Sequence, residues 1–306
     1  MPGTPLVSIV IPCYNQGRYL GDAIESARRQ SHEPVEVIVV DDGSTDDTAR
    51  VSAAHPDVRY VHQRNAGTAA ARNRGLRDSR GEFVVFLDAD DRLLPDAVAA
   101  SVDYLARHPD VAFVAGHVRL IEADGTPGIV PAQDHEPAGY AALLRWNHIW
   151  TPGVVLYRRT AFDAVGDFDA SAGGSADFDL NIRIARRLAI GCHHQVVLDY
   201  RQHDANMTRD AAHMLRSAVA VRRREKRFAT DAASRAAWRA GLAAAQADFG
   251  ARLIDRIKGD LVRGPRWRAV QGLCCLLRHY PAGVAIMAAP RQWPKLVARR
   301  WRTAPR

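Results

Sequence analysis

The sequence predicts an α/β protein with a mostly parallel sheet flanked by helices, followed by a helical, basic C-terminal extension. Two observations support this class. Short, continuous apolar runs alternate with helical patterns over about the first 110 residues, which is typical of a parallel sheet covered on both faces. From about residue 211 onward the chain is rich in Ala and Arg and has the spacing of helices.

The first expected strand, over 6–11, is a β-branched run that stops at Pro12. The helix expected over 17–30 has apolar residues at the spacing of one helical face. A second strand over 35–40 ends at an Asp-Asp-Gly-Ser turn, and Asp46 or Asp47 is the expected cap of the following helix.

The chain then continues the same alternation. A third strand is expected over 58–62, an Ala-rich helix over 67–78, a fourth strand over 82–87, and a helix over 95–107 with Pro near its first turn. The expected elements after residue 110 are strands at 111–121, 154–157 and 196–200, a loop at 124–137 and a helix at 177–189. The helices of the extension are expected to break at Gly264-Pro265, Pro281 and Pro290.

Polar clusters close three of these strands, at 12–15, 41–44 and 88–91. In open parallel sheets, ligands bind at the carboxyl ends of the strands. We therefore expect the three clusters to share one edge of the sheet and to form a binding site there.

The segment Phe86–Asp91 holds three carboxylates, Asp88, Asp90 and Asp91, within four positions. These groups repel one another unless a cation is present. A hard divalent cation resolves the repulsion and often brings phosphate oxygens with it. The alternative is a cluster of helix N-cap residues, because Asp is favoured there.

Two other segments direct polar groups to the same edge. Asp42 can accept a hydrogen bond from the imide N–H of a uracil, thymine or guanine ring, and the alternative is a tight Asp-Gly turn. Gly67 permits an unusual backbone angle, and the helix after it points its N-terminus to this edge, where Arg72 can meet a phosphate. The alternative for Arg72 is a solvated side chain on a surface helix.

These segments occur in order with Val7–Asn15 and with a later block, Gly173–Leu180. In this arrangement the chain resembles the family 2 inverting, nucleotide-sugar-dependent glycosyltransferases, which have the Rossmann-like GT-A fold. The match runs from about Leu6 to Asn206. The resemblance implies a catalytic domain over 1–210, made of a nucleotide-binding half over about 1–110 and an acceptor half over 111–210, and leaves 211–306 as a helical, Arg-rich extension.

The resemblance also implies the nucleotide site. Pro12, Tyr14 and Asp42 match positions that hold the base, Tyr14 by stacking and Asp42 by accepting the imide proton. Arg72 matches a position near the phosphates, and Asp88 begins the DxD motif, which contacts ribose in related enzymes. UDP is the default nucleotide, and GDP and dTDP stay open because their bases also carry an imide N–H.

A metal site follows from the same resemblance. Asp90, Asp91 and His203 are the expected ligands of Mn²⁺ or Mg²⁺, which offsets the charge that grows on the phosphate oxygen as the sugar leaves. The alternative for His203, taken alone, is a surface or core histidine.

Asp177 matches the general base of the family, which takes a proton from the acceptor hydroxyl in a single inverting displacement. The alternative for Asp177 is a helix N-cap. The chain departs from the family pattern at Ala176, where Glu is usual. This departure leaves the expected base in place but removes a side chain that the family pattern would direct to the acceptor. Trp146 and Trp150 are expected either to stack on a sugar or to pack in the core.

Charge is divided unevenly along the chain. Residues 1–204 hold 20 Lys and Arg against 28 Asp and Glu, whereas residues 205–306 hold 22 against 6. The extension also places Trp beside Arg at 263–268, 293–295 and 299–302, a combination suited to a membrane interface. An anionic membrane surface is therefore the expected partner, and a helical cap with a solvated Arg face is the alternative. Nucleic acid is not expected, because no recognised nucleic-acid-binding module is present.

Other sequence features concern location. The N-terminus lacks the pattern of a signal peptide, and no uninterrupted apolar run reaches about 18 residues, so no membrane span is expected. The four cysteines, Cys13, Cys192, Cys274 and Cys275, show no CxxC pair and no disulfide or zinc spacing. We expect a cytoplasmic protein, peripheral on the inner face of the cytoplasmic membrane.

The expected function is transfer of a sugar, of the hexosyl class, from a nucleotide sugar to a saccharide or lipid-linked acceptor in cell-surface polysaccharide synthesis. The alternative is a catalytically inert GT-A-like domain that acts as a binding or scaffold protein tethered by its basic tail. Retention of the carboxylates and the histidine together argues against an inert domain. The donor sugar, the acceptor and the oligomeric state have no sequence signature.

Overall fold

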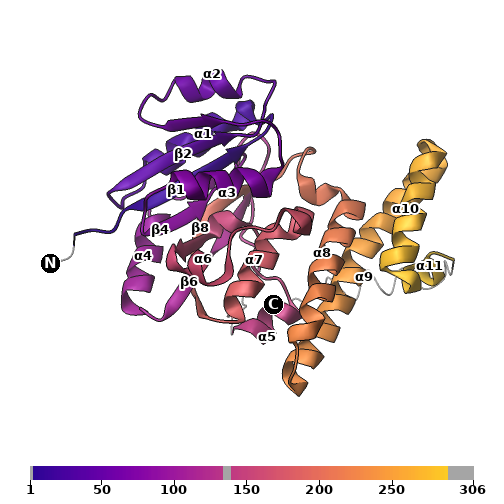
Figure 1. Ribbon diagram of the computed structural model, residues 1–306. Helices are drawn as coiled ribbons and strands as arrows, with labels where there is room; N and C mark the ends of the chain where they lie inside the picture. Colours follow the sequence, from indigo (N-terminus) through magenta and orange to yellow (C-terminus); the bar gives the residue numbers. More distant parts are fainter. Residues whose placement is uncertain (1–2, 134–138, 289–306) are drawn as a thin grey trace. The chain divides into compact units, whose positions relative to one another are not determined.

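The computed structural model describes residues 3–133 and 139–288 of the chain (Figure 1). It forms two compact units. The first comprises residues up to Leu143 together with Asn147–Asp204, and the second comprises Leu144–Trp146 together with the chain from Ala205 onward.

An eight-stranded sheet is the centre of the first unit, with strand order β3-β2-β1-β4-β7-β6-β8-β5. The strands are β1 (Val7–Cys13), β2 (Val35–Asp41), β3 (Arg59–His62), β4 (Phe83–Phe86), β5 (Arg92–Leu93), β6 (Val111–Ile121), β7 (Val155–Arg158) and β8 (Ala189–Arg201). The pairings β1–β2, β1–β4, β2–β3 and β6–β8 are parallel, whereas β7 runs antiparallel to β4 and β6, and β5 to β8. The expected mostly parallel α/β sheet is confirmed.

Helices flank this sheet. They are α1 (Gly17–Arg28), α2 (Thr48–Ala53), α3 (Thr68–Asp78), α4 (Ala97–Arg107), α6 (Thr160–Val165) and α7 (Ala176–Ala185), with short 3₁₀ turns at 152–154 and 170–175. The helix α3 packs on β1 and β2, and α4 packs on β6, β7 and β8. The helix α5 (Tyr140–Arg145) follows the segment at 134–138, which lies outside the described residues.

Apolar burial explains why the central strands form. Every residue of β1 is buried, as expected for a central strand with helices on both faces. At the edge of this core, Phe86 packs edge-on against Tyr157, Phe162 and Phe168, with ring centroids 4.8–6.0 Å apart. This aromatic group links the sheet to the segment that carries the candidate site.

The structure corrects the element boundaries of the second half. The helix expected over 177–189 ends at Ala185, and the strand expected over 196–200 is the 13-residue β8, which begins at Ala189. The first residues of β8 are paired with the start of β6, from Val111 to Ala115. Pairing with a distant strand, which local sequence does not encode, therefore sets this boundary.

The second unit is helical, as expected. Its helices are α8 (Ala211–Glu225), α9 (Ala232–Arg263), α10 (Arg266–His279) and α11 (Pro281–Ala288), with 3₁₀ turns at 207–209 and 226–228. They share an apolar core that includes Leu215, Val219, Leu253, Ile257 and Leu276. The expected breaks at Gly264-Pro265 and Pro281 are confirmed, whereas Pro290 and the Trp-Arg segments at 293–302 lie outside the described residues. Within the described chain, no helix has both the length and the apolar character needed to cross a bilayer.

Candidate active site

The three polar clusters lie at one edge of the sheet, because β2, β1 and β4 are adjacent and parallel. Pro12 is buried near the end of β1, opposite Val40 of β2. Tyr14 follows the strand and is 51% exposed. Its ring is therefore accessible to a ligand at this edge, as stacking on a base requires.

Asp42 organises a neighbouring loop. Its buried carboxylate accepts hydrogen bonds from Gln63 Nε2 (2.7 Å), Ala66 N (2.9 Å) and Gly67 N (2.8 Å). Gly67 has φ 90°, a backbone conformation that favours glycine. Asp41 Oδ1 accepts from Ser44 N, and Gly43 within this turn has φ 79°. The Asp-Gly turn of the alternative is therefore present, and Asp42 in addition holds the loop at 63–67.

Arg72 lies on α3 and is only 7% exposed, so the surface-arginine alternative is wrong. Its Nη2 donates to Asp88 Oδ1 at 2.7 Å, and its guanidinium lies 5.4 Å from the centroid of the Phe168 ring. Burial lowers the pKa of Arg72, but the charges of Asp88 and Asp177 outweigh this effect and the pKa is raised. Arg72 Nε is buried and has no hydrogen-bond acceptor among the described residues. It is therefore an unsatisfied donor buried beside Asp88.

Asp88 is held from two sides. Arg72 donates to Oδ1, and Thr151 Oγ1 donates to Oδ2 at 3.3 Å. Thr151 directly precedes the 3₁₀ turn at 152–154, and its hydrogen bond joins this turn to the acidic segment at 88–91. No role was expected for Thr151, although its neighbour Trp150 was named as a candidate.

Asp90 pairs with His203. The imidazole Nε2 of His203 lies 2.8 Å from Asp90 Oδ2, and its ring stacks on Tyr19 of α1 with a centroid distance of 4.9 Å. Burial and the nearby charge of Asp88 raise the pKa of Asp90 above its usual range. The structure thus places these two candidate metal ligands within hydrogen-bond distance of each other.

Asp91 is almost completely buried, at 1% exposed. Its Oδ1 accepts from Arg201 N at 3.0 Å, whereas Oδ2 has no hydrogen-bond donor among the described residues. Burial, together with the charges of Asp90 and Asp88, raises the pKa of Asp91 well above its usual range. The N-cap alternative for this cluster is wrong, because the N-cap of α4 is Asp96.

Arg201 is a structural partner of this cluster that sequence reasoning did not single out. Its buried guanidinium donates from Nε to the Asp90 carbonyl oxygen (2.8 Å) and from Nη2 to Asp22 Oδ2 (2.6 Å). It also lies over the ring of Tyr19. Both the backbone and the side chain of Arg201 therefore fix the position of the acidic segment. Arg201 could have been noticed because it follows Tyr200 within the part of the chain, about Leu6 to Asn206, that resembles the family.

Asp177 lies in the first turn of α7 and is half-buried. The N-cap of this helix is Ser175, so the N-cap alternative for Asp177 is wrong. Burial raises the pKa of Asp177; the charge of Arg72 lowers it, and that of Asp88 raises it. Asp177, Arg72 and Asp88 are therefore within electrostatic range of one another.

The two tryptophans are exposed. Trp150 is 44% exposed and lies edge-on to Tyr200, with a centroid distance of 6.2 Å. Trp146 is 45% exposed. The core-packing alternative is therefore wrong for both.

The structure thus joins the sequence-predicted residues in two groups. Arg72, Asp88 and Asp177 form one, and Asp90 and His203 form the other, with continuity of the acidic segment linking them. Asp91 directly follows Asp90, but its hydrogen bond is to Arg201 N. Pro12, Tyr14 and Asp42 lie on the adjacent strand ends. A groove of about 480 Å³, lined by residues that include Arg28, Arg59 and Arg80, lies at the opposite edge of the sheet, where β2 begins. It is separate from this site.

The family model for glycosyl transferase family 2 matches residues 8–166, the part of the chain that carries the strand ends and the acidic segment. The chain belongs to this family. This glycosyltransferase is 30% identical over 218 residues to an uncharacterized glycosyltransferase of Rickettsia typhi, covering 69% of each chain. It is also 42% identical over 185 residues to chondroitin synthase of Escherichia coli, a match that covers 59% of this chain and 26% of the relative.

Two solved structures show that the glycosyltransferase shares its fold with known enzymes. One is S. aureus TarS 1–349 in complex with UDP-GlcNAc, which covers 87% of this chain and 88% of its own, with a TM-score of 0.58 at 16% identity. The other is the mannosyltransferase PcManGT from Pyrobaculum calidifontis in complex with GDP-Man and Mn²⁺. It covers 96% of this chain and 89% of its own, with a TM-score of 0.55 at 21% identity. The expected GT-A fold is confirmed.

Proposed function

We propose that the protein transfers a sugar, of the hexosyl class, from a nucleotide sugar to a saccharide or lipid-linked acceptor with inversion of configuration. The convergence of Arg72, Asp88 and Asp177 beside the Asp90–His203 pair carries this proposal. UDP is the proposed nucleotide, and GDP and dTDP are the other candidates. The named activity of chondroitin synthase supports a role in cell-surface polysaccharide synthesis.

Asp177 is the proposed general base. It takes the proton of the acceptor hydroxyl while that oxygen attacks the anomeric carbon and the bond to the diphosphate breaks. A base works best when its pKa approaches the operating pH. Burial raises the pKa of Asp177 toward the operating pH, and the positive charge of Arg72 limits this rise because it favours the ionised carboxylate.

The acidic segment fits a divalent cation. Asp91 Oδ2 is a buried oxygen that has no donor within residues 3–133 and 139–288. Asp90 and Asp91 both have raised pKa values because burial and neighbouring carboxylates disfavour their charges. Carboxylate oxygens together with an imidazole suit Mn²⁺, and the oxygens also suit Mg²⁺. We propose Asp90, Asp91 and His203 as the residues that hold it. The metal would supply charge stabilisation for the leaving diphosphate.

The test is Asp177→Asn, with release of nucleoside diphosphate from UDP-, GDP- and dTDP-sugars measured in the presence of saccharide acceptors. Loss of the base is expected to lower turnover by about 10²–10⁴-fold. Nucleotide binding, measured by calorimetry, should change little, because Asp88 and Arg72 keep their hydrogen bond. The matched control is Asp163→Asn, an exposed aspartate in the first turn of α6. Normal turnover in Asp177→Asn would show that the base assignment is wrong.

We also propose that the second unit binds the inner surface of the cytoplasmic membrane. Support comes from exposed apolar side chains on its helices, including Leu261, Val262 and Trp267. The net positive charge of residues 205–306 favours anionic lipid. Such an enzyme would meet a lipid-linked acceptor at the membrane.

A further inference from the structure

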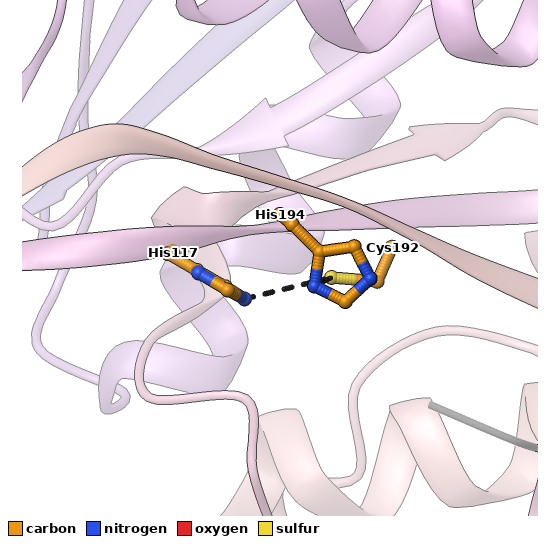
Figure 2. Close-up of side chains that lie close together, drawn as sticks. All are labelled: His117, Cys192 and His194. Carbon is orange, nitrogen blue, oxygen red and sulfur yellow. Dashed lines mark hydrogen bonds between the residues drawn. The ribbon is translucent and has the colours of Figure 1, made fainter. Parts of the chain in front are cut away.

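We propose that His117, Cys192 and His194 form a binding site for a transition-metal ion of the Zn²⁺ class. Cys192 Sγ lies 3.8 Å from His117 Nε2 and 3.9 Å from His194 Nδ1. All three ligand atoms lie within 4.8 Å of one another. Figure 2 shows the three side chains gathered around a common point. This cluster was not expected from the sequence, because none of the four cysteines has a standard zinc spacing.

A bulge between β6 and β8 creates this cluster. Ala115 pairs with Cys192, but His117 pairs with Val196, so residues 193–195 are opposite a single residue, Gly116. His194 lies in the bulge with φ 58°, a conformation that is uncommon for a residue with a side chain. The bulge thus brings His194 back beside Cys192, two positions earlier on the same strand.

Gly116 makes the bulge possible. A Cβ atom there would lie 2.5 Å from Val197 Cγ2 and 2.7 Å from His193 Cε1, closer than real Cβ contacts allow. Any other residue would therefore push the bulge away from β6. Cys192 and His117, on opposite strands, would then move apart.

His193 holds the bulge in place and is not one of the proposed ligands. Its Nδ1 accepts from Gln195 N at 3.2 Å, so in the neutral ring the proton is on Nε2. Nε2 faces Ser101 Oγ at 3.1 Å, and that hydroxyl donates to the Ala97 carbonyl oxygen at 2.8 Å. Nδ1 of His193 therefore bonds within the bulge, and Nε2 tethers the bulge to α4.

The donor set selects the type of metal. One thiolate and two imidazoles suit Zn²⁺ and similar ions, whereas Mg²⁺ and Mn²⁺ prefer oxygen ligands. With Zn–S about 2.3 Å and Zn–N about 2.0 Å, a tetrahedral site has S···N separations of about 3.5 Å. The two observed S···N separations exceed this by only a few tenths of an ångström, and the two imidazole nitrogens, which lie within 4.8 Å of each other, would move closer together on binding. Binding would convert the Cys192 thiol to a thiolate with release of one proton, and water would complete the tetrahedron.

This site is separate from the active-site carboxylates. His117 precedes Ile121 by four residues on β6, and Ile121 pairs with Arg201. Four strand residues span about 13 Å. The proposed ion would therefore clamp β6 to β8 within the acceptor half of the sheet, and the proposal does not depend on the proposed function.

The test uses Co²⁺ as a spectroscopic probe on the full-length protein after chelation, with excess Mg²⁺ present to occupy the carboxylate site. We expect the thiolate-to-cobalt charge-transfer absorption to saturate at one equivalent of Co²⁺ in the wild type. Cys192→Ser should lose this absorption, and Cys274→Ser, a change at an exposed cysteine of α10, should keep it. Zn²⁺ added afterwards should displace Co²⁺ and abolish the absorption.

A second variant guards against misfolding of Cys192→Ser. His194→Ala changes an exposed side chain of the bulge and is expected to weaken Co²⁺ binding by at least about tenfold, with the circular dichroism spectrum unchanged. Absence of the charge-transfer absorption in the wild type would overturn the proposal. Equal Co²⁺ binding by the wild type and by both ligand variants would overturn it as well.

Discussion

Arg72 interacts with two carboxylates of the candidate active site, Asp88 and Asp177. It is buried, hydrogen-bonds to Asp88 and lowers the pKa of Asp177. The positive charge of Arg72 opposes the rise that burial causes in the pKa of Asp177. Removing Arg72 should therefore change the protonation of the proposed base as well as nucleotide binding.

We predict that Arg72→Gln moves the acidic limb of the pH–rate profile to higher pH. The base must be ionised, so activity falls as the pH drops through the pKa of Asp177. Burial raises this pKa and Arg72 opposes the increase, so loss of the guanidinium raises it further. The measurement is kcat/KM against pH. Arg74→Gln, which removes an ion pair with Asp78 on the same helix, is the control and should leave the limb in place. An unchanged limb in Arg72→Gln would contradict this electrostatic role.

From the sequence alone, a residue could be named as a site candidate where the residues next to it in the chain form a recognisable pattern. The acidic segment at 88–91 and Asp42 were identifiable because carboxylates follow apolar strands. Tyr19 and Arg201 were not, because their roles arise from contacts with residues far away in the chain, such as His203 and Asp22. The proximity of His117 and Cys192 was not predicted from the sequence for the same reason, since only the pairing of β6 with β8 brings the two residues together.

Among the elements, α10 combines an exposed apolar stripe with flanking positive charge. Trp267, Val270 and Leu277 are 58%, 59% and 51% exposed, and their spacing places them on one face of the helix. Arg266, Arg268 and Arg278 flank them in the sequence. An interfacial helix has this composition, with apolar side chains entering the lipid and Arg meeting the headgroups.

We predict that the full chain cosediments with vesicles containing anionic lipid, and less at high salt. Replacing Trp267, Val270 and Leu277 together by Ser should weaken binding by at least about tenfold, because each inserted side chain contributes on the order of 1 kcal/mol. The matched control replaces Ile129 and Val130, exposed apolar residues of the first unit, by Ser. Equal vesicle binding by the α10 variant and the wild type would contradict the proposal.

Element boundaries were predictable where local pattern and packing agree. The strand at 111–121 was expected with the boundaries that β6 has, and the breaks at Gly264-Pro265 and Pro281 were found where expected. By contrast, β8 has 13 residues where a strand of five was expected at 196–200, and β5 has only two residues. Both elements exist because a distant strand supplies their hydrogen bonds, which a local pattern does not record.

In the folded molecule as a whole, burial disfavours the charged forms of three carboxylates of the candidate active site. The pKa values of Asp90, Asp91 and Asp177 are all raised, with burial as the main cause. An acid with a raised folded-state pKa opposes folding once the pH exceeds its unfolded pKa of about 4, and the penalty is complete above the folded pKa. A cation and a diphosphate that neutralise this cluster should therefore stabilise the folded protein.

The most direct test of the account is a thermal-shift panel of UDP-, GDP- and dTDP-sugars, with and without Mn²⁺, on the wild type and on Asp90→Asn. We predict that at least one nucleotide sugar raises the Tm of the wild type only together with Mn²⁺. A ligand at 100 times its Kd stabilises by about 2.7 kcal/mol, and Asp90→Asn should lose that gain. If none of these nucleotide sugars raises the Tm in the presence of Mn²⁺, or if Asp90→Asn responds as the wild type does, the central claim is contradicted.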